Sequence, residues 1–483
     1  MTPTHPAAVV ILAAGGGTRM RSATPKVLHT IGGRTLLGHA LATARSLAPQ
    51  HVVVVVRRER DRVAAHVADV DPDATLADQD EVAGTGRAAE CGLRALPAHL
   101  TGTIVVTMGD VPLLTAATLQ QLLDRHVEGG AAMTLATAQL PDPTGYGRVL
   151  YDETGSVRGI IEERDATDEQ RSLTEVNAGI YAFDVSSLRA ALAQIGTDNA
   201  QREKYLTDSV AVLRAGGARV LAHPVDDRWE TEGVNDRVQL ARLGAELNRR
   251  VVEHWMRAGV TVVDPATTWV DVDVTLGRDV TIRPQTQLLG ACTIGDDVVI
   301  GPDTTLTDVE VGRGASVVRT QATLALIGDG ASVGPYAHLR PGTELGARGK
   351  IGEFVGTKNA VIGDGAKVPH LSYVGDADIG EGTNIGAGTI FANYDGVAKH
   401  HTTVGAQCRT GANNTFVAPV TIGDGAATGA GTVVRRTVPP GSLAVSTGPQ
   451  RVVSDWVRRR RPGTPAHRAA ERALDAAASQ ESP

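Results

Sequence analysis

The sequence predicts two folds in one chain: an α/β domain with a mostly parallel, doubly wound sheet, followed by a parallel β-helix. Over about the first 230 residues, apolar β-branched runs alternate with amphipathic segments, as in βαβ units. Beyond residue 263, an aliphatic residue recurs at every sixth position, often followed by glycine. That period fits neither a helix face nor an alternating strand, and it is typical of a hexapeptide β-helix.

The elements of the α/β part follow one another along the chain. Strands are expected at AAVVILAA (7–14), HVVVVV (51–56) and TIVVTMGD (103–110), and helices near 36–48, 58–68 and 115–128. Ligands of doubly wound sheets bind at the carboxyl ends of the strands. The loops after residues 13, 107 and 182 are therefore the predicted binding loops.

A long helix is predicted between the two parts, from Asp236 to Ala258. Gly259 follows where a C-cap glycine belongs, and apolar residues recur at three- and four-residue spacing, namely Leu240, Leu243, Leu247, Val251 and Trp255. We therefore expect four segments, which are a first domain (1–235), a linker helix (236–262), a β-helix domain (263–455) and a partly disordered C-terminal tail (456–483).

The six-residue repeat occurs in four runs, which begin at Leu276, Ile327, Ile362 and Thr410. Three hexads make one triangular coil of about 18 residues, with the aliphatic side chains stacked inward. Between Phe391 and Val404 an excursion leaves the repeat, and long loops on a rigid scaffold often hold function. It carries Asn393, Tyr394, Lys399, His400 and His401, of which the two histidines are expected to be solvated loop residues.

The composition excludes several classes of protein. A net charge of -7 argues against a nucleic-acid partner, and the N-terminal apolar run is too short for a signal peptide or a membrane span. The 3 cysteines have no metal or disulfide spacing, which favours free thiols and a cytoplasmic location. The 55 glycines are concentrated in the repeat, where coil corners require small residues.

A glycine-rich loop follows the first strand, in LAAGGGTRM and then PKVLH. Glycines let the backbone approach a phosphate closely, while Arg19 and Lys26 offset its charge. The spacing matches neither the dinucleotide-binding fingerprint nor the P-loop. A plain tight turn is the alternative interpretation of the three glycines.

The wider pattern resembles the sugar-1-phosphate nucleotidyltransferases, with Leu12, Gly15, Gly17, Thr18, Arg19, Pro25 and Lys26 at their signature positions. Together with the segments RPG, HLSYVGD, NIGAGT and NYDG of the second half, the chain resembles the bifunctional N-acetylglucosamine-1-phosphate uridyltransferase and glucosamine-1-phosphate acetyltransferase family. The resemblance implies a left-handed β-helix and a homotrimer. It also implies two reactions that yield UDP-N-acetylglucosamine, namely acetyl transfer from acetyl-CoA to glucosamine-1-phosphate, then uridylyl transfer from UTP to N-acetylglucosamine-1-phosphate.

The resemblance also assigns nucleotide-site residues in the first half. Arg19 and Lys26 would bind the triphosphate, and Asp110 with Asn235 would hold Mg²⁺, which prefers few oxygen ligands. The implied set for UTP or UDP-N-acetylglucosamine is Leu12, Ala13, Gly15, Arg19, Lys26, Gln79, Gly84, Thr85, Gly147, Glu162, Asn177 and Asn235. From its position alone, Asp110 could instead be a helix-capping residue.

In the second half, amine acetylation requires a base, and histidine has a suitable pKa. His370 occupies the position of the family's catalytic histidine. The implied sugar-phosphate ligands are Arg340, Lys358, Tyr373 and Asn384, and the acetyl-CoA residues are Ala387, Asn393, Tyr394, Ala412 and Ala430. Thr447 and Ala412 replace the Arg and Ser of many members, which leaves the CoA contacts open.

Two other interpretations remain. A single-activity nucleotidyltransferase could carry the β-helix only for oligomerisation, but His370 and the NYDG excursion argue against that interpretation. A regulatory module that merely binds sugar nucleotides would not need Asp110 at the end of an apolar strand. The sequence assigns no role to the tail after Trp456, and it does not give the kinetic order or regulation.

Overall fold

The computed structural model describes residues 5–153, 155–199, 201–446, 448 and 450–480. Thr447 therefore lies outside the described residues. The chain forms two compact units, residues 1–330 and 331–483. Each unit is described by itself.

The first unit contains a nine-stranded sheet in the order β11-β7-β10-β6-β1-β4-β5, with β8 and β9 attached beside β10. Its strands are β1 (Ala8–Leu12), β4 (His51–Val56), β5 (Thr75–Asp78), β6 (Thr103–Met108), β7 (Met133–Gln139), β8 (Arg148–Tyr151), β9 (Val157–Ile161), β10 (Glu175–Asp184) and β11 (Val220–Pro224). The strands β6, β1, β4 and β5 run parallel, which confirms the predicted mostly parallel sheet.

One predicted binding loop is wrong. Strand β10 runs antiparallel to both β6 and β7, so its carboxyl end lies at the opposite edge of the sheet from those of β1 and β6. The loop after residue 182 therefore does not join the other two predicted loops. The pattern of apolar residues cannot distinguish a parallel from an antiparallel buried strand.

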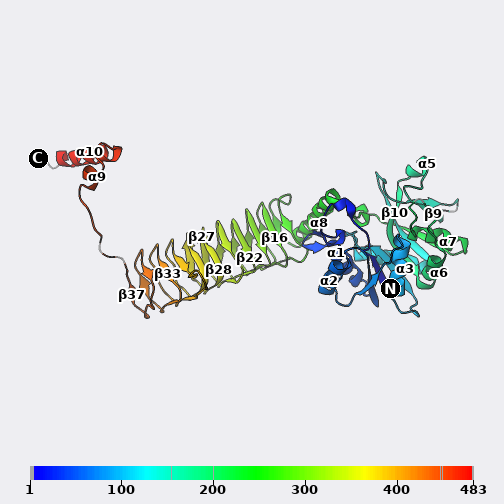
Figure 1. The fold of residues 1–483 in the computed structure, drawn as a ribbon, viewed down its shortest axis with the longest axis horizontal. Helices are drawn as coiled ribbons and strands as arrows, with labels where there is room; N and C mark the ends of the chain where they lie inside the picture. Colours follow the sequence, from blue (N-terminus) through cyan, green and yellow to red (C-terminus); the bar gives the residue numbers. More distant parts are fainter. Residues whose placement is uncertain (1–4, 154, 200, 447, 449, 481–483) are drawn as a thin grey trace. The chain divides into compact units, whose positions relative to one another are not determined.

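Helices cover both faces of this sheet (Figure 1). One core cluster joins the sheet to α1 (Leu36–Ser46), α2 (Arg60–Val70) and α4 (Ala116–Glu128), and the other to α3 (Thr85–Arg94), α6 (Val185–Gln194) and α7 (Ser209–Ala215). Val9 and Ile11 of β1 enter the first cluster and Val10 the second. A strand buried on both faces explains its unbroken apolar sequence.

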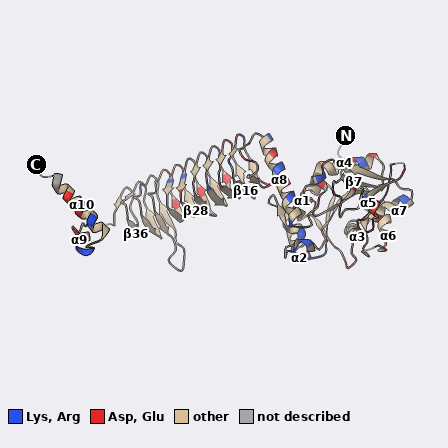
Figure 2. Ribbon diagram, turned by 90° about the horizontal axis from the view of Figure 1, so that it is seen from above, with Lys and Arg blue, Asp and Glu red and all other residues tan. Residues whose placement is uncertain are grey.

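The predicted long helix is α8 (Arg237–Arg257), which confirms that interpretation. The Asp236 side chain caps it by accepting hydrogen bonds from the Val238 and Gln239 amides. Leu243 is buried in a separate hydrophobic cluster of the first unit, together with Met20 and Leu36. Figure 2 shows that both basic and acidic residues occur along α8.

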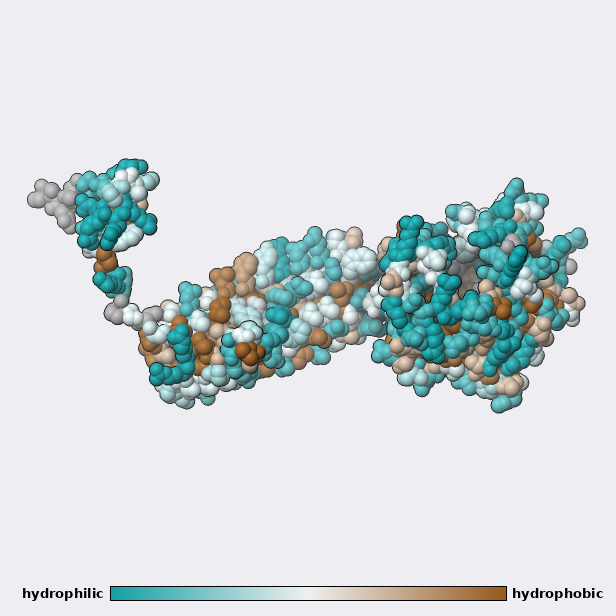
Figure 3. Space-filling view, in the orientation of Figure 1, coloured by the Kyte–Doolittle hydropathy of each residue, from teal (hydrophilic) through white to brown (hydrophobic). Residues whose placement is uncertain are grey.

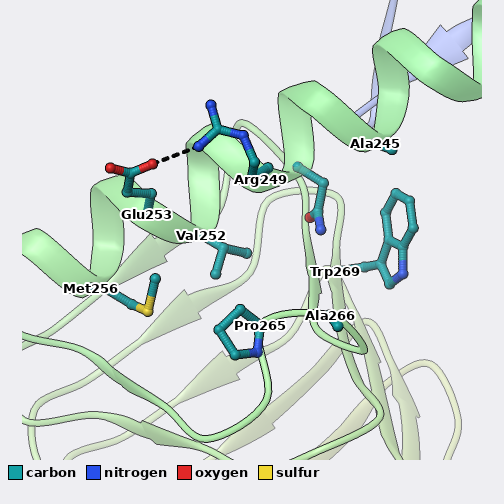
Figure 4. Close-up of a pocket in the computed structure, with 9 residues that line it drawn as sticks. Ala245, Arg249, Val252, Glu253, Met256, Pro265, Ala266 and Trp269 are labelled. Atoms are coloured by element: carbon teal, nitrogen blue, oxygen red, sulfur yellow. Dashed lines mark hydrogen bonds and ion pairs between the residues drawn. The ribbon is translucent and has the colours of Figure 1, made fainter.

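Asn248 fixes α8 to the first coil of the β-helix. Its amide donates to the Thr268 carbonyl at 2.8 Å and accepts from the Val270 amide at 3.0 Å. An apolar pocket of about 480 Å³ lies beside this contact, lined by Val252, Met256 and Trp269 among others (Figure 4). None of the predicted site residues lines it.

Short parallel strands stack from coil to coil in the rest of the first unit. One column runs β12 (Thr261–Val262), β15 (Thr281–Ile282), β18 (Val299–Ile300), and a second runs β13 (Trp269–Val270), β16 (Thr286–Leu289), β19 (Thr304–Thr307), β22 (Thr320–Thr323). The repeated aliphatics Ile282, Leu288 and Ile300 are fully buried. Burial at every sixth position confirms the hexapeptide interpretation.

The second unit is also a stack of parallel strands. Its first column is β24 (Ser332–Val333), β27 (Lys350–Glu353) and β29 (Lys367–His370). Others are β25 (Ala337–Leu339), β26 (Thr343–Leu345), β28 (Gly356–Ile362), β30 (Tyr373–Ile379), β31 (Ile390–Ala392), β32 (Thr402–Val404), β33 (Thr415–Val417) and β34 (Val420–Ile422). This curled parallel sheet is that of a left-handed β-helix. Short helices α9 (Trp456–Arg460) and α10 (Pro465–Gln480) follow the coils.

Two further sequence expectations can be compared with the structure. The 3 cysteines are free, as predicted, and all of them are buried. None of the helices in the described residues combines the length and apolar character that spanning a bilayer requires.

Candidate active sites

The first unit holds a pocket of about 580 Å³ at the carboxyl ends of β1, β4 and β6. It is formed by the glycine loop after β1, the turn after β4 and the segment before α3. Eight predicted site residues line it, namely Leu12, Ala13, Gly15, Lys26, Gln79, Gly84, Thr85 and Asp110. The other predicted residues, Arg19, Gly147, Glu162, Asn177 and Asn235, are not in its lining.

The glycine loop is more than a generic tight turn. Gly17 has φ 56°, and a Cβ there would lie 2.6 Å from the Lys26 Cβ, closer than packed atoms come. Gly15 is different, because a Cβ on it would meet no atom within 4 Å. Gly17 thus lets Lys26 approach, while the backbone at Gly15 faces open space in which a phosphate could lie.

Lys26, Asp110 and Asn235 come together from three distant segments. The Lys26 ammonium pairs with an Asp110 carboxylate oxygen and lies 3.5 Å from the Asn235 amide oxygen. The Val234 amide donates to the Asp110 carbonyl at 2.9 Å, which holds the segment before α8 against the end of β6. Asp110 is therefore not the helix cap that its position also allowed.

This geometry tests whether a divalent cation fits between Asp110 and Asn235. Their two oxygens already converge on one cationic group, the Lys26 ammonium. Among the described residues, no three His, Cys, Asp or Glu side chains gather as a metal site. A carboxylate and an amide oxygen suit Mg²⁺, which keeps several waters and needs few protein ligands.

The wall formed by Gln79, Gly84 and Thr85 is rigid. The Gln79 amide nitrogen donates to the carbonyls of Val82 at 2.9 Å and Gly84 at 3.2 Å. Gly84 has φ 111°, and a Cβ there would lie 2.3 Å from the Lys204 carbonyl oxygen. The Gln79 side chain and the Gly84 backbone are therefore held in place, so that a ligand could bind to this wall without rearranging it.

Gly147, Glu162 and Asn177 form a separate cluster, just before β8, just after β9 and within β10, respectively. The Asn177 backbone amide donates to the Gly147 carbonyl at 2.8 Å, and a Cβ on Gly147 would lie 3.5 Å from the Glu162 carboxylate. Thr207 donates to that carboxylate at 3.0 Å. Burial raises the pKa of the Glu162 carboxyl, so this is a costly place for a charge unless a polar ligand covers it.

In the second unit, His370 has a partner that the sequence analysis missed. Glu353 is its register partner in the preceding coil, and the Glu353 carboxylate lies 2.9 Å from His370 Nδ1. A neutral imidazole that donates Nδ1–H to this carboxylate keeps its lone pair on Nε2. The spacing of 17 residues, about one coil, is the signal that could have pointed to Glu353.

The predicted phosphate ligands Arg340 and Lys358 are joined by Lys399 from the excursion. The neighbouring Lys399 ammonium lowers the pKa of Lys358, and Arg340 adds to the effect. One carboxylate, Asp376, offsets these three cations, and it accepts a hydrogen bond from Asn393. Such a surplus of positive charge suits an anionic ligand. Lys399 is one of only six lysines in the chain, which was an available signal.

Tyr373 and Asn393 lie together over Gly375. A Cβ on Gly375 would be 2.3 Å from the Tyr373 hydroxyl and 2.8 Å from the Asn393 amide nitrogen. Asn384 lies in the coil wall, where its backbone N–H donates to the Cys408 carbonyl at 2.9 Å. The residues predicted to contact the sugar and the acetyl group thus lie on neighbouring coils.

In the coils that follow His370, small residues occupy the positions that stack on the corner at His370. Gly388 donates to His370, Asn413 to Ala387, and Gly431 to Ala412, all between backbone groups. Ala387, Ala412 and Ala430 therefore stack along one edge of the helix next to His370. This edge therefore carries small side chains at three of the positions predicted to contact acetyl-CoA.

The excursion is an ordered hairpin. Asp395 accepts hydrogen bonds from the Val397 and Ala398 amides at 2.8 Å and lies 2.6 Å from His400 Nε2. His401 lies 3.0 Å from the Asp378 carboxylate. The two histidines, expected to be merely solvated, each bond a carboxylate. Tyr394 is exposed in this hairpin and donates to the Gly396 carbonyl at 2.7 Å.

Comparison with known proteins finds matches for both parts of the chain. Residues 9–175 match the MobA-like NTP transferase domain, and residues 273–308 match the bacterial transferase hexapeptide repeat. The chain is 60% identical to the bifunctional protein GlmU of Kineococcus radiotolerans, over 98% of this chain and 96% of that protein. It is 58% identical to the GlmU protein of Pseudarthrobacter chlorophenolicus, over 99% of this chain and 97% of that protein. It is 60% identical to the GlmU protein of Mycobacterium sp. strain KMS, over 98% of this chain and 96% of that protein. The chain therefore belongs to the family of bifunctional GlmU proteins and is an enzyme with a nucleotidyltransferase and an acetyltransferase activity.

Proposed function

We propose that this enzyme makes UDP-N-acetylglucosamine by acetylating glucosamine-1-phosphate with acetyl-CoA and then transferring a uridylyl group from UTP. The observation that carries the proposal is the presence of two chemically different sites. One is a glycine-lined pocket with Lys26 and Asp110, and the other pairs His370 with Glu353 beside a lysine pair. A coil that served only oligomerisation would need neither the His370–Glu353 pair nor the cations.

In uridylyl transfer, a phosphate oxygen of N-acetylglucosamine-1-phosphate attacks the α-phosphorus of UTP, and pyrophosphate leaves. Such a step depends on positioning and charge neutralisation. The glycine loop and Lys26 would hold the phosphates, Gln79, Gly84 and Thr85 the uracil, and Glu162 and Asn177 the sugar. Asp110 and Asn235 would hold Mg²⁺, which when bound supplies further neutralisation of phosphate charge.

In acetyl transfer, His370 Nε2 takes a proton from the 2-ammonium group of glucosamine-1-phosphate. The amine then attacks the thioester carbonyl, so that the C–N bond forms and the C–S bond breaks, and the second proton that the nitrogen loses is taken up by the departing CoA thiolate. Arg340, Lys358 and Lys399 would hold the sugar phosphate. Tyr373, Asn384 and Asn393 would orient the sugar and the acetyl group, with Tyr394 beside them.

Glu353 is a positioning residue for His370 in this mechanism, because it fixes which imidazole nitrogen carries the lone pair. We expect Glu353→Gln to lower kcat for acetyl transfer about 10-fold and Glu353→Ala about 100-fold or more, with the KM for glucosamine-1-phosphate unchanged. Thiol release measures both parameters. Asp378→Asn, which alters the similarly exposed His401 pair, is the matched control. An equal fall in kcat for the Glu353 variants and for Asp378→Asn would contradict the positioning role of Glu353.

We also propose a homotrimer. Tyr336, Phe354 and Leu371 occupy successive coil corners, are 53%, 58% and 61% exposed, and have positive φ. The Tyr336 and Phe354 rings stack at 5.2 Å. Figure 3 shows hydrophobic atoms exposed on the coils. An apolar column next to Glu353 and His370 favours a second copy of the chain as its cover.

Phe354→Lys is therefore expected to convert the trimer into monomers, because a charge would be buried in the interface. Acetyl transfer would be lost and uridylyl transfer retained. Light scattering after size exclusion measures the mass. Gln285→Lys, at an exposed corner with the same left-handed backbone, is the control. A wild-type protein that elutes as a monomer would overturn the proposal.

The domain boundaries and the cytoplasmic location stay predictions. Residues 1–235 are proposed as the uridyltransferase domain, 236–262 as the linker helix, 263–455 as the acetyltransferase domain and 456–483 as the tail. Free, buried thiols are compatible with a reducing compartment. No partner beyond the small-molecule substrates and further copies of the chain is proposed.

A further inference from the structure

Arg58, which the sequence analysis did not single out, also lines the nucleotide pocket. It follows β4 in the turn before α2, and its side chain lies over the glycine loop. A Cβ on Gly16 would be 3.2 Å from Arg58 Cδ, 3.3 Å from Nε and 3.4 Å from Nη1. The guanidinium therefore faces the same space as the backbone of Gly15 and Gly16.

The sheet explains this placement. Strands β1 and β4 are parallel neighbours, with Leu12 opposite Val55, so the loops that follow them meet at one edge. Glu59 adopts a left-handed backbone with φ 51°. The resulting sharp turn directs the chain into α2 and leaves Arg58 at the rim of the pocket.

Arg58 differs from the pocket's other cations because it is unpaired among the residues that the structure describes. Lys26 is paired with Asp110, and Arg57 donates to the Glu81 carbonyl at 3.0 Å and its carboxylate at 3.3 Å. Within the described part of the chain, Arg58 makes no hydrogen bond or ion pair. An unpaired guanidinium beside exposed backbone is a ready site for an anion.

Its position also indicates which phosphates it would meet. Lys26 and Asp110 are mostly buried, with side chains 13% and 19% exposed, whereas Arg58, Gly15 and Gly16 are exposed. The terminal phosphates of a nucleoside triphosphate leave as pyrophosphate and must have a path to solvent. Arg19, to which the resemblance gives a triphosphate role, is outside the pocket lining.

We propose that Arg58 binds the β- and γ-phosphates of the nucleoside triphosphate and so stabilises the departing pyrophosphate. The inference rests on the proposed uridylyl transfer, in which negative charge accumulates on the leaving group. A planar guanidinium presents a rigid fork of N–H groups that matches two phosphate oxygens, whereas the lysine ammonium acts as a point charge without that fixed geometry. Neither the uracil nor the sugar carries a charge that would require Arg58.

The test compares two product-like probes on the full-length protein. Pyrophosphate carries the groups that Arg58 would bind, whereas UMP lacks them. Titration calorimetry measures the binding of each probe, with Mg²⁺ present, to wild type, Arg58→Ala, Arg58→Lys and Arg60→Ala. Arg60→Ala is the matched control because it removes the same charge two residues away. Arg60 itself is paired with Asp78 and is not in the pocket lining.

We expect Arg58→Ala to weaken pyrophosphate binding about 10-fold and to lower kcat/KM for UTP by 10- to 100-fold, with UMP binding unchanged. Arg58→Lys should recover part of the loss and Arg60→Ala should behave as wild type. Pyrophosphate binding to Arg58→Ala that equals wild type would overturn the assignment, as would an equal weakening of UMP. If wild type releases no pyrophosphate from UTP, the proposed function fails instead.

Discussion

Replacement of Lys26 by alanine is expected to abolish uridylyl transfer and to leave acetyl transfer at its wild-type rate. Lys26 is the one cation that contacts Asp110 while lying against the glycine loop at Gly17. Without it, the phosphates face an unbalanced carboxylate. We expect kcat/KM for UTP to fall on the order of 10³-fold or more, as for other preorganised charged groups.

The two activities of this variant are measured by pyrophosphate and thiol release in separate assays. Lys350→Ala, which removes an exposed lysine from a coil, is the control for loss of charge. The Lys26–Asp110 pair is partly buried, so the melting temperature is recorded as well. Equal loss of both activities would point to misfolding and would contradict a role confined to the nucleotide pocket.

Replacement of His370 by alanine is expected to have the opposite result. Acetyl transfer should fall by about 10²- to 10⁴-fold, because the substrate amine is mostly protonated near neutral pH and loses its base. Uridylyl transfer from N-acetylglucosamine-1-phosphate should continue. The contact between Glu353 and His370 Nδ1 makes Nε2 the basic atom, and no other described histidine lies on this corner of the coils.

His401→Ala is the matched control for His370→Ala. His401 also contacts a carboxylate and is 49% exposed, against 47% for His370, but it lies at the end of the excursion and pairs with Asp378 rather than with Glu353. The control should retain acetyl transfer within about twofold. Thiol release by His370→Ala at a near-normal rate would remove His370 from the mechanism.

Periodicity predicted the main architecture because it records which side chains are buried. Ile282, Leu288 and Ile300 are buried at every sixth position, and Val9, Val10 and Ile11 are buried without a break in a two-sided sheet. The direction of β10 was not predictable in this way, since a buried strand has the same apolar sequence in either direction. Because β10 is antiparallel to its neighbours, the loop after residue 182 lies at the opposite edge of the sheet from the nucleotide pocket.

Some site residues could be predicted from motifs, whereas others could be found only from the fold. Residues that the motifs assign to one nucleotide site, such as Lys26, Asp110 and Asn235, come together in the fold. Glu353 and Arg58 were missed because each reaches its site through register with a neighbouring coil or strand. Lys399 was named only as a residue of the excursion, and its effect on Lys358 became visible only in the folded hairpin. Register depends on coil length and turn geometry, which single motifs do not contain.

The corner residues show a further limit of sequence patterns. Positive φ usually favours glycine or asparagine, yet Tyr336, Phe354 and Leu371 adopt it. Backbone hydrogen bonds between coils, such as Leu371 to the Glu353 carbonyl at 2.9 Å, hold this conformation. Large apolar residues at such corners are explained by what they cover or contact, not by backbone preference.

The central claim is that one chain carries out two consecutive reactions at two independent sites. The most direct test supplies glucosamine-1-phosphate, acetyl-CoA, UTP and Mg²⁺ to the wild-type protein and follows thiol and pyrophosphate release separately. Both products should form, with pyrophosphate release lagging behind thiol release. No thiol release, together with pyrophosphate formed only when N-acetylglucosamine-1-phosphate is supplied directly, would contradict the claim.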